Sequence, residues 1–139
     1  MEEFLMRLTE VIKNEREALI NLLNLLDEQY KFIMNKDVLS LEDVVDKIRL
    51  SSKTIAEFEV ERRSIAGDNK MQELINQYND EDLDTEFRKI KVLLESVNLQ
   101  KETNELLIKQ QMSYNSQILR ILNPSREIKT YNSYGNLRR

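Results

Sequence analysis

The sequence predicts an all-α fold: an elongated antiparallel bundle of three long helices over about residues 2–34, 40–66 and 82–122, with a short helical segment near 70–78 and a flexible C-terminal tail. Apolar residues recur every three or four positions over long stretches, which is the spacing of one face of an α-helix. The 139 residues include only two Gly and one Pro, where average usage would give roughly ten Gly. The turns that β-hairpins and phosphate-binding loops need are therefore scarce.

The first helix is predicted over about residues 2–34. At 1.5 Å per residue it is on the order of 50 Å long, so a companion helix of similar length must cover its apolar stripe. That stripe, in which Glu15 and Gln29 share the register, consists of Leu5, Leu8, Ile12, Leu19, Leu22, Leu26 and Ile33.

The second helix is predicted to begin at Ser40, whose hydroxyl can cap a backbone N–H, with the acidic Asp43 three residues later. It should end near Gly67, because glycine readily adopts the left-handed conformation that closes a helix. Its inward-facing positions are Val44, Ile48, Ile55, Phe58, Arg62 and Ile65.

The third helix follows an acidic break at residues 79–82 and ends before Pro124. Its predicted seam is apolar at Leu83, Phe87, Ile90, Leu94 and Val97, then carries Lys101, Asn104, Gln111 and Asn115 among apolar residues. A coiled-coil seam that uses Asn and Gln to specify register is one interpretation. The other is that residues 100–122 extend roughly 20 Å beyond the shorter second helix and offer a semi-polar surface to a partner helix.

Charge separates the chain into two expected parts, a helical bundle over 1–123 and a basic tail over 124–139. The net charge is −4, and the tail carries +3, which leaves −7 on the bundle. An acidic body disfavours nucleic-acid binding, and the tail holds too few apolar groups to offset the entropy of ordering. We expect residues 100–123 to be the partner-binding end of the bundle.

Composition also excludes most catalytic chemistry. Without His or Cys, the chain has no zinc site of the usual kind, no Ser–His or Cys–His nucleophile and no disulfide. We expect no enzyme activity and no cofactor. The acidic residues near 80–84 lack the spacing of a calcium loop and are expected to complement a helix dipole. An acidic N-terminus and the lack of a long apolar run predict a cytoplasmic protein that does not insert into membranes.

Three weak motifs occur in order along the chain. Lys53 is followed nine residues later by Arg62 in the second helix, and Asn104 precedes the pair Leu106 and Leu107 in the third. Tyr131 lies four residues before Gly135 in the tail, with Asn132, Ser133 and Tyr134 between them. Together with the long helices, these features resemble the FlgN family of flagellar export chaperones over nearly the whole chain. The family usually has Gly and Pro inside the tail motif, so either Tyr131 or Tyr134 is the equivalent tyrosine.

The resemblance implies a cytoplasmic chaperone of flagellar type III secretion. Such a protein would bind the C-terminal helical segments of the hook-associated proteins FlgK and FlgL, prevent their premature assembly and deliver them to the export gate protein FlhA. The implied contacts with the gate are Tyr131, Tyr134 and Gly135. The implied client-binding residues are Asn104, Leu107, Ile108, Gln111, Tyr114, Ile118, Ile121 and Leu122.

A structural coiled-coil scaffold or adaptor that acts by self-association is the alternative function. A scaffold would keep apolar seams to its ends, whereas a chaperone leaves a gap shaped for its partner. The periodicity leaves open whether the chain forms a homodimer in the absence of a client.

Overall fold

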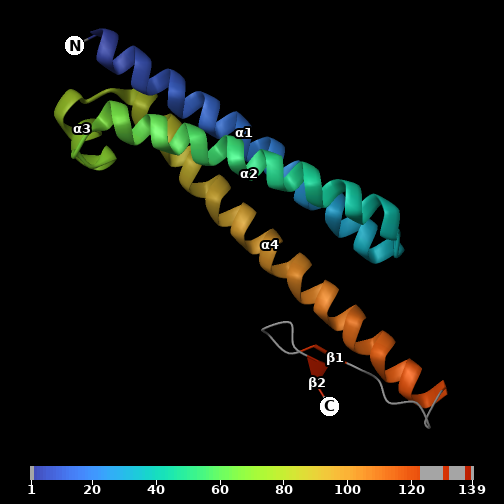
Figure 1. The fold of residues 1–139 in the computed structure, drawn as a ribbon. Helices are drawn as coiled ribbons and strands as arrows, with labels where there is room; N and C mark the ends of the chain where they lie inside the picture. Colours follow the sequence, from blue (N-terminus) through green and yellow to red (C-terminus); the bar gives the residue numbers. More distant parts are fainter. Residues whose placement is uncertain (1, 123–129, 132–136, 139) are drawn as a thin grey trace. The chain divides into compact units, whose positions relative to one another are not determined.

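The computed structural model describes residues 2–122, 130–131 and 137–138, with side chains through Tyr114 (Figure 1). It contains the helices α1 (Glu2–Asn35), α2 (Val38–Ala66), α3 (Met71–Tyr78) and α4 (Glu81–Leu122). The three long helices and the short segment predicted from the sequence are confirmed, each end to within two residues. Two short strands, β1 (Thr130–Tyr131) and β2 (Leu137–Arg138), lie in the segment expected to be a flexible tail.

The chain divides into two compact units, Met1–Asn104 and Glu105–Arg139. The first unit contains α1, α2, α3 and the first part of α4, and the second contains the rest of α4. The boundary predicted after residue 123 falls inside the second unit. There β1 and β2 pair in antiparallel fashion, with Thr130 opposite Arg138 and Tyr131 opposite Leu137.

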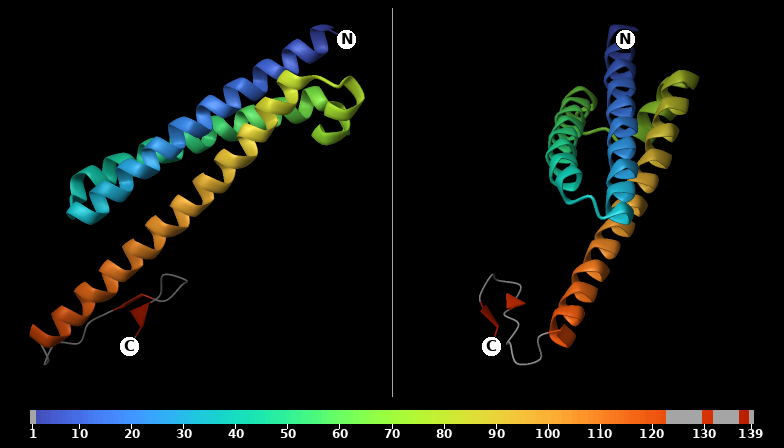
Figure 2. Two further views of the ribbon diagram at one scale, coloured as in Figure 1. Left: turned by 180° about the vertical axis from the view of Figure 1, so that it is seen from behind. Right: turned by 90° about the vertical axis from the view of Figure 1, so that its right-hand side faces the viewer.

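Within the first unit, α1 lies between α2 and the first part of α4 (Figure 2). Ion pairs give the directions of the helices: Glu15 of α1 meets Arg62 of α2, whereas Lys13 and Arg16 meet Asp82 and Glu86 of α4. Hydrogen bonding between Asn21 and Ser51 supports the antiparallel α1–α2 pairing. Helices α1 and α4 therefore run in the same direction and α2 runs against both.

The hydrophobic core follows the predicted stripe of α1. Buried positions there are Leu8, Ile12, Glu15, Leu19, Leu22, Leu26 and Ile33, with Val11 in addition. At the N-terminal end of α1, α3 completes the core through Met71, Leu74 and Ile75. The rings of Phe4 and Tyr78 lie 5.9 Å apart there.

The start of α2 differs from the prediction. Its N-cap is Asp37, whose carboxylate accepts hydrogen bonds from the backbone N–H and the hydroxyl of Ser40. These bonds lower the pKa of Asp37. Ser40 is thus a donor to the cap rather than the cap itself, since a carboxylate three residues earlier can accept both of its protons. The end at Ala66 is as predicted, and Gly67 has φ +66° but an extended ψ of −139° rather than a left-handed helical one.

The seam of α4 also differs from the prediction. Leu94 and Lys101 are exposed, and the inward positions between Ile90 and Asn104 are Leu93, Val97 and Gln100. Glu86 is buried one residue before the half-buried Phe87. The seam is therefore not wholly apolar before Val97, because Glu86 of α4 forms an ion pair with Arg16 of α1.

Candidate functional site

A buried ion pair joins α1 to α2. Arg62 Nε donates to Glu15 Oε2 at 2.9 Å, and both side chains are largely shielded from solvent. Burial raises the pKa of Glu15 above its ordinary value of 4.5, although the neighbouring Arg62 acts in the opposite direction. Such a pair contributes little net stability but is costly to break. Arg62, one of the residues that carry the family resemblance, therefore positions α2 against α1, while Lys53 is exposed.

A second ion pair joins α1 to α4 one residue further along. Arg16 Nη1 lies 3.1 Å from Glu86 Oε2, and the Lys89 ammonium approaches the same carboxylate at 3.5 Å. Only 6% of the Glu86 side chain is exposed, against 24% for Arg16 and 50% for Lys89. The buried carboxylate thus holds two cations at the surface between α1 and α4.

Asn104, the first of the predicted partner-binding residues, lies at the end of the first unit and is buried. Its Nδ2 donates to the carbonyl of Leu26 at 2.8 Å and to Gln29 Oε1 at 2.9 Å, and Gln100 Nε2 donates to its Oδ1 at 2.9 Å. These bonds give Asn104 the role of specifying the register of α4 against α1. In this structure its amide is engaged within the chain.

The other predicted partner-binding residues belong to the second unit. Leu107, Ile108 and Gln111 are half-buried, and Tyr114 is 57% exposed. Their spacing places them on one side of α4, because residues three and four apart share a helix face. Ile118, Ile121 and Leu122 continue that spacing within α4, and their side chains lie outside the described part.

Of the predicted tail contacts, Tyr131 lies in β1. Tyr134 and Gly135 lie outside the described residues.

Several exposed apolar side chains were not singled out as site residues from the sequence. Met112 is 64% exposed on α4, and two residues along a helix correspond to about 200°, which places it on the other side of the helix from Tyr114. Val92, Leu99 and Leu106 form an exposed row at seven-residue spacing. That spacing is visible in the sequence, but it lies outside the stripe that the three-and-four pattern selects.

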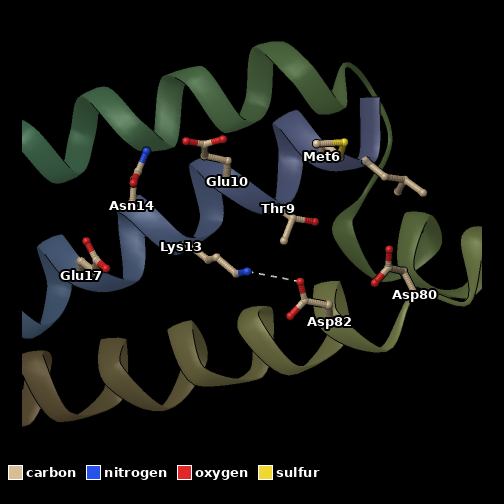
Figure 3. A pocket seen from close by; sticks show the side chains of 9 residues that line it. Met6, Thr9, Glu10, Lys13, Asn14, Glu17, Asp80 and Asp82 are labelled. Atoms are coloured by element: carbon tan, nitrogen blue, oxygen red, sulfur yellow. Dashed lines mark ion pairs between the residues drawn. The ribbon is translucent and has the colours of Figure 1, made fainter. Parts of the chain in front are cut away.

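Carboxylates surround an open groove between α1 and the start of α4 (Figure 3). Lys13 Nζ lies 3.4 Å from Asp82 Oδ2, and Glu10, Glu17 and Asp80 line the same groove. Both partners of this ion pair are well exposed, so it adds little stability. Asp80 accepts a hydrogen bond from the backbone N–H of Leu83, which is the helix-start role predicted for the acidic break. Among the described residues, no group of three or more acidic side chains is arranged to hold a metal ion.

Comparison with known protein families shows that the model of the FlgN family, described as FlgN protein, matches residues 1–139. No curated protein and no solved structure matches the chain. Among the described helices, none has an apolar stretch long enough to span a bilayer.

We predict that Asn104→Ala lowers the free energy of unfolding by about 1–3 kcal/mol, because Gln29 and Gln100 lose their shared partner in a buried setting. Urea unfolding followed by circular dichroism measures this change. Asn98→Ala is the matched control, since Asn98 lies exposed on the same helix. Equal destabilisation by the two variants would contradict the assigned role of Asn104.

We also predict a pH dependence from Glu15. A carboxyl whose pKa is raised by folding binds its proton more readily in the folded state, so its charge is a cost at neutral pH that is relieved as the pH falls. The unfolding free energy of the wild type minus that of Glu15→Gln should therefore increase from about pH 7 toward 4.5. A difference that stays level or decreases over this range would show that burial does not dominate the Glu15 environment.

Proposed function

The chain belongs to the FlgN family of flagellar export chaperones, and from this premise we propose that it binds the C-terminal helical segments of FlgK and FlgL in the cytoplasm. Bound in this way, the hook-associated proteins would not assemble prematurely, and the chaperone would deliver them to the export gate protein FlhA. The observation that carries the proposal is the family match over residues 1–139, the whole length of the chain.

The proposed client-binding surface is the stripe of α4 that runs from Leu107 to Leu122. It is supported by the exposed Tyr114 and the half-buried Leu107 and Ile108, which are anchors of the size and shape that helix-in-groove recognition uses. Polar residues such as Gln111 interrupt the stripe. A fully apolar stripe of this length would be prone to aggregation when empty, whereas a semi-polar one can bind a partner reversibly.

The hydrogen bonds of the first unit define where on α4 the proposed client surface begins. Up to Asn104, the amides of the α4 seam are used inside the chain, because Gln100 and Asn104 hydrogen-bond to each other and Asn104 also bonds to α1. Beyond Asn104, apolar and amide residues continue to alternate along α4. We assign this second stretch to the client and the first to the fold.

Holding and releasing a client requires no chemical step, and we propose none. The affinity of such a surface comes from a few apolar and aromatic anchors rather than from total area. A scaffold that acts by self-association would instead give a stable homo-oligomer whether or not FlgK or FlgL is present. Light scattering of the chain alone and with each client fragment separates the two functions.

We predict that Tyr114→Glu weakens binding of FlgK and FlgL C-terminal fragments by about tenfold or more, because it places a charge among the apolar anchors of the stripe. Isothermal titration calorimetry with each fragment measures the change. Lys109→Glu is the control, since it also introduces a carboxylate, Lys109 is exposed, and at about 100° per residue it lies opposite the stripe on α4. If both variants weaken client binding equally, or if neither weakens it, the assignment of this surface to the client is contradicted.

We predict that Tyr131→Ala combined with Tyr134→Ala leaves client affinity unchanged and reduces both FlhA binding and secretion of FlgK. The physical reason is that the tyrosines belong to the tail rather than to the client stripe, and an aromatic ring is a common anchor of short linear contacts. Asn132→Ala with Asn136→Ala is the control within the same segment. If the tyrosine double variant loses its client instead, the tail belongs to the client-binding surface.

A further inference from the structure

A second groove between α1 and α4 lies wholly within the first unit, whereas the proposed client stripe belongs to the second. It has a volume of about 660 Å³. Its apolar lining consists of Ile20 of α1 with Val92 and Leu93 of α4. Ile20 and Val92 are exposed. Neither of these two side chains is part of the core, and with the half-buried Leu93 they offer an apolar strip to a partner.

All the ionisable side chains that line this groove are cationic: Arg16, Arg88 and Lys89. Their counter-charges cancel them only in part, because Arg16 and Lys89 share a single carboxylate, that of Glu86. Arg88 pairs with Asp84 four residues earlier on the same helix, and such an exposed pair is easily exchanged for a better one. On a chain of net charge −4, this groove is locally positive.

The neighbouring groove of Figure 3 has the opposite charge. The pairs Lys13–Asp82 and Arg16–Glu86 are about one turn apart on both helices, so the two grooves follow one another along the α1–α4 interface. The carboxylates of the acidic groove shown in Figure 3 would repel an acidic ligand that continued past Arg16. The cationic section therefore suits an acidic segment of only a few helical turns.

We propose that this cationic groove binds a short amphipathic helix of a partner protein, with an apolar stripe flanked by Asp or Glu. The stripe would cover Ile20, Val92 and Leu93, and the flanking carboxylates would pair with Arg16, Arg88 and Lys89 in the manner of helix-in-groove recognition. Phosphate-rich ligands fit less well, because the adjoining carboxylates would face a polyanion along its length. This interaction does not depend on the client stripe.

The test uses the full chain and a fluorescein-labelled synthetic helix of about three turns, with a leucine stripe flanked by glutamates. A second peptide carries lysine in place of every glutamate. Fluorescence anisotropy should show that the glutamate peptide binds at least about tenfold tighter than the lysine peptide, since like charges across an interface are repulsive. Equal binding of the two peptides, or no binding of the glutamate peptide, overturns the proposal.

Two matched pairs of variants locate the site. Arg88→Gln and Val92→Ser should each weaken binding of the glutamate peptide by about fivefold or more, the effect expected of an anchor residue. The controls are Arg63→Gln and Val60→Ser on α2. Arg63 is 72% exposed and paired with Glu59 at i,i+4, as Arg88 is 76% exposed and paired with Asp84, and Val60 is 68% exposed against 63% for Val92. Equal losses in the controls would place the peptide elsewhere.

Two further measurements exclude other occupants. Tyr114→Glu should bind the glutamate peptide like the wild type, and a loss would mean that the peptide occupies the proposed client stripe. Sedimentation velocity of the unliganded chain should show no association that depends on Arg88 or Val92. A dimer that Arg88→Gln or Val92→Ser dissociates would assign the groove to a second copy of the chain and overturn the proposal. Circular dichroism of each variant checks that it is folded.

Discussion

The first unit depends on one constraint: α1 has a single buried stripe that two other helices must share. Polar side chains lie within that stripe, and each must find a partner because an unpaired buried charge or amide is costly. Glu15 forms an ion pair with Arg62 of α2, and Arg16 forms one with Glu86 of α4. Gln29 accepts a hydrogen bond from Asn104 of α4. Apolar packing alone would tolerate a shift of either helix, whereas these pairs are satisfied in one register only.

This constraint divides α4 into stretches with different tasks. Through Asn104, its inward residues face α1, and Glu86, Gln100 and Asn104 have polar partners inside the chain. From Leu107 onward, the same helix belongs to the second compact unit and carries the residues that we assign to the client. A helix that is firmly registered along one part can present its remaining side chains in a defined order, which a flexible peptide could not do without an entropic cost.

Burial of carboxylates also shapes the surface of the protein. Because the buried carboxylate of Glu86 is shared by the two cations Arg16 and Lys89, this cluster has a net positive charge and makes the surface beside it positive. The exposed carboxylates of the adjacent groove produce a negative one. A chain with a modest net charge therefore offers two grooves of opposite charge along α1 and α4. The cationic groove would select the proposed acidic ligand, and the acidic groove would limit the length of that ligand.

The sequence by itself determined the all-α class, the four helical segments and nearly the whole buried stripe of α1, because apolar spacing and helix-ending residues such as Gly67 are local properties. It also carried the motifs through which the family is recognised, and the family match confirms that resemblance. The tyrosines of the tail and the α4 stripe were named from this resemblance and stay predictions.

Only the tertiary structure decided the phase of α4. Leu94 and Lys101 are as compatible with a three-and-four spacing around Ile90 and Val97 as Leu93 and Gln100 are, since the two alternatives are one residue apart. The residues of α1 opposite them select between the two: Arg16 pairs with Glu86 in the interface, on the side of α4 where Leu93 and Gln100 are half-buried. A choice between two equivalent helix faces depends on which residues lie opposite, and no pattern within one helix contains that information.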